Sequence, residues 1–94
     1  DLKHEEFLKS KTEDIMRKVP ELDAKIDEVA QGWKTKRMGR VDLTILRLAL
    51  YEMLYDDEVP EKVAINEAVE LAKKFGGNES PAFINGVLAK LVQG

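Results

Sequence analysis

The segment from Glu79 to Lys90 carries side chains that could hold a single-stranded nucleic acid. The Phe83 ring could stack on an unpaired base, while the Ser80 hydroxyl and the free backbone N–H groups of a helix start could bind a phosphate. Lys90, two helical turns along, could contact another phosphate. Glu79 repels phosphate, so its simplest role is to favour the helix N-terminus, and it would limit affinity for RNA. The alternative for Phe83 is to fold back over the edge of the core.

A second group of charged residues lies at another predicted helix start. Asp42 is most simply a first-turn charge or a cap there, and Arg40 stands just before it. The basic residues of segment 34–40 follow Trp33 and could form a nucleic-acid patch with an aromatic platform. We favour the simpler interpretation, which is a solvated connection with Trp33 directed into the core.

Catalytic chemistry has little support in the sequence. There is no cysteine and a single histidine, His4, so nucleophile-and-base pairs and the helical zinc-protease motif are missing. The carboxylates of 56–58 could bind a hard cation, but a short acidic loop before a helix is usually solvated. We therefore predict a binding module that is not an enzyme and that uses no metal or cofactor.

Length and composition favour a single small globular domain. The chain has 94 residues, of which 44% are hydrophobic and 35% are charged. Its net charge of -3 means that nucleic-acid binding would need a local patch or a partner's charge. The lack of cysteine fits a cytoplasmic protein, and no apolar run reaches the ~18 residues that span a membrane. The chain begins at Asp1 without an initiator methionine, so we expect a fragment or a processed chain.

The spacing of apolar residues predicts an all-α fold, a compact bundle of about five helices. The expected helices cover about 3–18, 20–31, 42–55, 61–75 and 81–92. The helix at 42–55 is apolar nearly all round and should lie at the centre. The next helix has an alanine-rich face, and the last one has an apolar stripe formed by Ile84, Val87, Leu88 and Leu91.

Proline and glycine mark most of the expected helix ends. Pro20 should open the second helix, and Gly76 should end the fourth at a position that tolerates a left-handed conformation. Ser80 should cap the last helix ahead of Pro81.

Two residues inside the expected helices stand out from their surroundings. Arg47 is the one cation within the apolar helix at 42–55, so we expect it to pair with an internal carboxylate. Gly86 lies beside Phe83 and Lys90, at i, i+3 and i+7, and should permit close approach of another backbone.

Three ordered blocks of the sequence resemble the NusB transcription antitermination family. They are RVD at 40–42 leading into ILRLALYE at 45–52, VPEKVAINEAVELAKKFG at 59–76, and Ser80 and Phe83 followed by NGVL at 85–88. Three blocks in the family's order and spacing are far more specific than one short motif. The resemblance is tight from about Trp33 to Leu88 and loose before that.

The resemblance implies a helical domain that binds boxA-type RNA together with NusE, a small-subunit ribosomal protein, in the complex that keeps RNA polymerase elongating. It implies that the helix start at Ser80 and Phe83 lies near RNA, and that Asp42, with Arg40 beside it, faces NusE. Family members begin with an arginine-rich first helix that has no counterpart here. The chain is therefore expected to be an N-terminally incomplete NusB-like domain.

Two other functions stay open at this point. The same module resembles the N-terminal domain of a ribosomal RNA cytosine methyltransferase family. This chain would then be an accessory domain, because it has no Rossmann-type cofactor motif. The third reading is a structural or oligomerising fragment, since a missing first helix would leave apolar surface exposed and favour self-association.

Overall fold

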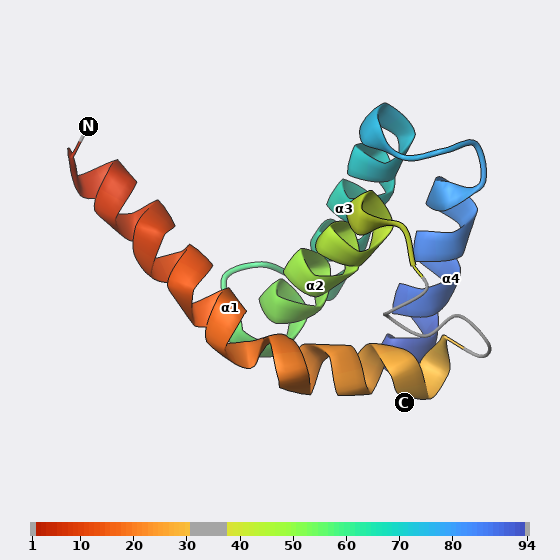
Figure 1. Cartoon of the computed structure of the whole chain (residues 1–94), viewed down its shortest axis with the longest axis horizontal. Coiled ribbons are helices and arrows are strands. Elements are labelled where there is room, and N and C mark those ends of the chain that lie inside the picture. The colour runs from red at the N-terminus through yellow and green to blue at the C-terminus, as the bar shows by residue number, and fades with distance from the viewer. Residues whose placement is uncertain (1, 31–37, 94) are drawn as a thin grey trace.

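The computed structural model describes residues 2–30 and 38–93, and within these ranges it contains four helices and no strand. They are α1 (Leu2–Val29), α2 (Arg40–Tyr55), α3 (Glu61–Phe75) and α4 (Ser80–Gln93), arranged as Figure 1 shows. The prediction of an all-α fold is confirmed, but the described residues form four helices where about five were expected. None of these helices is long and apolar enough to cross a membrane.

The first two expected helices are one continuous helix, so the prediction that Pro20 opens a new helix was wrong. Pro20 lies inside α1, and Figure 1 shows that α1 bends along its length. A proline inside a helix removes one backbone hydrogen bond and tilts the preceding turn, and here it bends the helix without ending it. The C-terminal half is held in place by Leu22 and Ile26, both 0% exposed, while the N-terminal end of the helix projects beyond the other helices.

Helix α2 lies at the centre of the fold, as its all-round apolar character predicted. It contacts α1, α3 and α4. Helix α3 contributes the alanine face of residues 64, 68 and 72, whose small side chains let it pack closely against its neighbours. The described core consists of Leu22, Ile26, Ala30, Ile45, Leu46, Ala49, Leu50, Tyr51, Ala68, Ala72, Ile84, Val87 and Leu88.

A two-pronged ion pair fixes the C-terminal half of α1 against α2. The Arg47 Nε donates to Asp23 Oδ1 at 2.8 Å, and its Nη2 donates to Asp23 Oδ2 at 2.7 Å. This confirms the prediction that Arg47 pairs with an internal carboxylate. The parallel geometry adds directional specificity to the contact and so orients the end of α1 that borders the site described below.

A second polar contact joins the N-terminal half of α1 to α2. The Tyr51 hydroxyl donates to Asp14 Oδ2 at 2.6 Å, and the Lys18 ammonium donates to Asp14 Oδ1 at 2.9 Å. The hydrogen bonds from Lys18 and Tyr51 lower the pKa of Asp14 to about 2, and the bond to Asp14 raises the pKa of Tyr51 to about 12. The folded state therefore stabilises the ionised Asp14 carboxylate and the neutral Tyr51 phenol.

These pKa shifts predict that the free energy of unfolding decreases at both low and high pH. The Asp14 contribution is complete above its ordinary pKa of 3.8 and is lost as pH falls toward 2. The Tyr51 contribution is complete below its ordinary pKa of 10.0 and is lost as pH rises toward 12. Tyrosinate absorbance should show Tyr51 ionising near 12 in a Tyr55→Phe background, where it is the only tyrosine. Asp14→Asn should move that pKa back toward 10.0. Ionisation of Tyr51 near 10.0 with Asp14 intact would contradict the contact.

The part of α1 before Pro20 exposes several large apolar side chains, namely Leu2, Phe7, Leu8 and Met16. An exposed apolar surface of this kind favours association. Self-association of the chain stays a prediction, and sedimentation analysis across a concentration series would test it.

Candidate functional site

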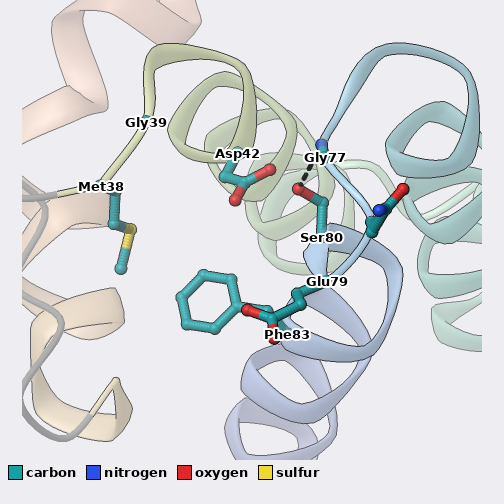
Figure 2. A pocket seen from close by; sticks show the side chains of 8 residues that line it. Met38, Gly39, Asp42, Gly77, Glu79, Ser80 and Phe83 are labelled. Carbon is teal, nitrogen blue, oxygen red and sulfur yellow. Dashed lines mark hydrogen bonds between the residues drawn. The ribbon is translucent and has the colours of Figure 1, made fainter.

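The starts of α2 and α4 face each other across a pocket of about 570 Å³. Figure 2 shows the Phe83 ring projecting from α4 into this space, with Met38 and Asp42 pointing toward it. The lining residues are Met38, Gly39, Asp42, Gly77, Asn78, Glu79, Ser80 and Phe83. The fold thus brings Asp42 together with Glu79, Ser80 and Phe83, which the sequence had placed at two separate helix starts. Arg40 and Lys90 do not line this pocket.

Ser80 stabilises the turn between α3 and α4 and does not cap α4 as predicted. Its Oγ accepts a hydrogen bond from the Gly77 N–H at 3.0 Å, drawn as the dashed line in Figure 2. The Phe83 N–H donates to the Glu79 carbonyl at 3.0 Å, so Glu79 holds the cap position and Ser80 is already helical. Ser80 is only 7% exposed and its hydroxyl serves the turn, whereas the Glu79 carboxylate next to it is exposed.

Gly76 is required by close packing and not by a left-handed backbone, which corrects the sequence prediction. Its φ of -94° and ψ of -177° are extended angles that any residue adopts. A Cβ at this position would lie 2.6 Å from both Cβ and Oγ of Ser80, and 2.9 Å from the Ala72 carbonyl oxygen. The turn from Gly76 to Ser80 is therefore too tight for any side chain at position 76.

Phe83 has the simpler of its two predicted roles, packing over the edge of the core, and stacking on a base stays a prediction. It is half-buried and packs against the core, and it also lines the pocket. An aromatic ring anchored along one edge is held in a fixed direction, so stacking on its remaining surface would cost little side-chain entropy.

The pocket on this side of Phe83 is acidic. Asp42 is half-buried in the first turn of α2, Glu79 is exposed, and no cationic residue of the described chain lines the pocket. Asp42 is thus a first-turn charge, as one of the two predicted roles had it, and Gly39 holds the cap position without a side-chain bond. Two carboxylates around one opening attract a cationic side chain and repel phosphate.

A smaller depression of about 270 Å³ lies on the other side of Phe83. It runs between the end of α1 and one face of α4, and its lining residues are Val29, Ala30, Ala82, Phe83, Gly86, Val87 and Lys90. Lys90 is the charged residue among them. The Phe83 side chain therefore separates an acidic pocket from a depression with a cationic rim. Sequence reasoning missed Val29 and Ala30, because only the tertiary packing of α1 brings them here.

Gly86 does not serve close packing within the described chain, contrary to the prediction. It is exposed in the interior of α4, and apart from its chain neighbours and the adjacent backbone of its own helix, no described atom lies within 4 Å of the place where a Cβ would stand. Glycine inside a helix lowers stability by about 1 kcal/mol relative to alanine, and no packing contact among the described residues offsets this loss.

Two other predicted features stand apart from these pockets. Trp33 and the basic residues 34–37 lie outside the described residues. The Asp56–Glu58 turn is closed by a bond from the Glu58 N–H to Asp56 Oδ1 at 3.1 Å, and the described residues contain no cluster of three or more potential metal ligands.

The chain matches the model of the NusB family over residues 1–93. It is 58% identical over 85 residues to the transcription antitermination protein NusB of Agathobacter rectalis, covering 90% of this chain and 65% of the relative. It is 52% identical over 88 residues to the protein of the same name from Lachnoclostridium phytofermentans, covering 94% of this chain and 67% of that one.

A solved structure agrees with these sequence matches. T. maritima NusB is similar to this chain with a TM-score of 0.91 and 33% identity, covering 99% of this chain and 66% of that one. The chain spans about two thirds of the length of the relatives that it matches. Since sequence and fold agree over nearly all of its residues, the chain belongs to the NusB family.

Proposed function

We propose that this chain acts in transcription antitermination by binding boxA-type RNA together with the ribosomal protein NusE. The role is one of binding and not of catalysis, within a cytoplasmic complex on elongating RNA polymerase. Family membership and the names of the relatives support the proposal.

The observation that carries the proposal is the position of Phe83 between two pockets of opposite charge. On one side, Asp42 and Glu79 suit a cationic side chain of a protein partner. Arg40 lies near the same helix start, outside the pocket, and could contact the same partner. On the other side, Lys90 suits a phosphate. A single aromatic residue at the border would thus let RNA and a protein partner bind next to each other.

A binding experiment with matched RNAs tests this function. A fluorescein-labelled boxA-like RNA should bind the chain more tightly when NusE is present, and more tightly than an RNA of scrambled sequence and equal length. Equal affinity for both RNAs, with and without NusE, would contradict the proposal.

Asp42→Lys is expected to weaken NusE binding by about tenfold, because it replaces an attractive charge at the pocket with a repulsive one. Isothermal titration calorimetry of NusE into the variant measures this. Glu67→Lys is the matched control, since it makes the same charge reversal at an exposed position on α3 outside both pockets. Full NusE affinity in Asp42→Lys would remove Asp42 from the partner surface.

A further inference from the structure

Pro20 divides α1 into two segments that are held against the rest of the protein in different ways. The segment after Pro20 is anchored by burial, since Leu22 and Ile26 are 0% exposed, and by the two-pronged ion pair to α2. No described residue of the segment before Pro20 is buried, although Ile15 packs against the edge of the core. The fold therefore fixes one end of α1 much more firmly than the other.

Polar contacts join the segment of residues 2–19, here called the arm, to α2. The Tyr51 hydroxyl donates to Asp14 Oδ2 at 2.6 Å, and the Lys11 ammonium donates to Glu52 Oε2 at 3.2 Å. The first distance is that of a strong charge-assisted hydrogen bond, whereas the second is long for a bond of this kind. The bond from Tyr51 is therefore the stronger of these two links between the arm and α2.

Side chains only partly fill the space between the arm and the end of α2. A pocket of about 380 Å³ lies there, and its walls include Phe7 and Ser10 of the arm and Tyr55, Asp56 and Glu58 across from them. Because water can already reach both walls of this pocket, separating them would expose little additional apolar surface. The arm can thus move here without breaking a tightly packed interface.

We propose that Pro20 is a hinge about which the arm swings away from α2 as one helix, and that the hydrogen bond between Tyr51 and Asp14 is the latch that keeps it closed. Proline has no backbone N–H, so one helical hydrogen bond is missing at this point and the helix bends more easily. Asp14 also accepts from Lys18 at 2.9 Å and from Arg17 at 3.3 Å within the arm, and such pairs help an exposed helix to stay helical. Breaking the latch should therefore release the arm without unfolding it.

Arm opening does not depend on the proposed binding of RNA and NusE. The two pockets beside Phe83 are lined in α1 by Val29, in the anchored segment, and by no residue of the arm. Local opening of a weakly held element needs less free energy than unfolding of the whole domain. Loss of RNA binding would leave the hinge unaffected, and a rigid arm would leave the proposed function unaffected.

Distances between paired spin labels test the hinge, and the absence of cysteine from the chain allows labels at chosen positions. One pair, at Lys9→Cys and Glu67→Cys, joins the arm to α3. The other pair, at Glu28→Cys and Glu67→Cys, joins the anchored segment to α3. All three side chains are exposed. Double electron–electron resonance should show a main and a longer, minor population for the arm distance, and one narrow population for the anchored distance.

Tyr51→Phe removes the latch hydroxyl and keeps the buried ring. It should raise the ratio of open to closed arms about tenfold, while the anchored distance and far-UV helicity stay unchanged. Tyr55→Phe is the matched control, because it removes a hydroxyl that donates to Glu21 on the anchored side of Pro20, and it should change the ratio by less than about twofold. Adding Pro20→Ala to Tyr51→Phe restores the missing backbone donor and should narrow the distribution of the arm distance.

Each of four results would overturn the proposal. An unchanged arm distance in Tyr51→Phe would remove the latch, and an equal change in Tyr55→Phe would show a general loosening of α1. A loss of helicity in Tyr51→Phe would show that the segment before Pro20 unfolds and does not swing. A broad arm distance that persists after Pro20→Ala would place the bend elsewhere in α1.

Discussion

Phe83→Asp is expected to lower the affinity for a boxA-like RNA by about 50-fold while far-UV helicity stays unchanged. Stacking of a base on an aromatic side chain contributes about 1–3 kcal/mol, and all of it is lost with the ring. The new carboxylate would join Asp42 and Glu79, so repulsion of phosphate adds to the loss. Because Phe83 is only half-buried at the edge of the core, the helices should survive the change.

Three further variants make this result specific. Phe75→Asp replaces an aromatic side chain that is 65% exposed at the end of α3, and it should leave RNA affinity unchanged. Phe83→Leu keeps an apolar contact with the core but removes the aromatic surface, so it should still lose about tenfold. Glu79→Asn removes a charge that repels phosphate and should tighten binding. Unchanged RNA affinity in Phe83→Asp would rule out a contact between this ring and a base.

Gly76→Ala is expected to lower the free energy of unfolding by about 3 kcal/mol, at the upper end of the range for overpacking. The added Cβ would lie 2.6 Å from two Ser80 atoms and 2.9 Å from a backbone carbonyl, and a backbone atom cannot move aside as the end of a side chain can. The turn would open, the bond between the Gly77 N–H and Ser80 Oγ would be lost, and the start of α4 would shift. Urea unfolding monitored by circular dichroism measures the effect.

The neighbouring glycine supplies the control for this prediction. Gly77→Ala adds the same methyl group one residue along, where nothing lies within 4 Å, and should change stability by less than about 0.5 kcal/mol. Combining Gly76→Ala with Ser80→Gly removes two of the three clashing atoms and should recover part of the loss. Equal stability of Gly76→Ala and Gly77→Ala would show that the turn is not as tight as described.

The helical spacing of apolar residues was sufficient to predict the core, because the buried face of a helix requires apolar residues at that spacing. The all-round apolar helix at 42–55 does lie at the centre as α2, and the stripe of Ile84, Val87 and Leu88 is buried. The prediction that Pro20 opens a helix was wrong because proline is common both at a first helical position and at a bend inside a helix. Only the packing of Leu22 and Ile26 against the other helices decides between those roles.

The sequence indicated candidate residues one at a time but not how they are arranged. Local patterns singled out Asp42 and Phe83, yet no sequence signal says that the starts of α2 and α4 share one pocket. The reasons given for Gly76 and Gly86 were also wrong. For Gly76 the deciding distances are to Ser80 and Ala72, each four residues away, and they depend on the exact path of the turn. For the shared pocket and for Gly86 the missing information is the distance between separate segments, which tertiary packing sets.

The most direct test of RNA binding at Phe83 and Lys90 is a titration of the chain with boxA-like RNA over a series of salt concentrations, with and without NusE. One phosphate contact, from Lys90, predicts a slope of log affinity against log salt near about -0.7, and Lys90→Gln should bring the slope close to zero. A slope near zero for the parent chain, with Phe83→Asp binding equally well, would contradict the account.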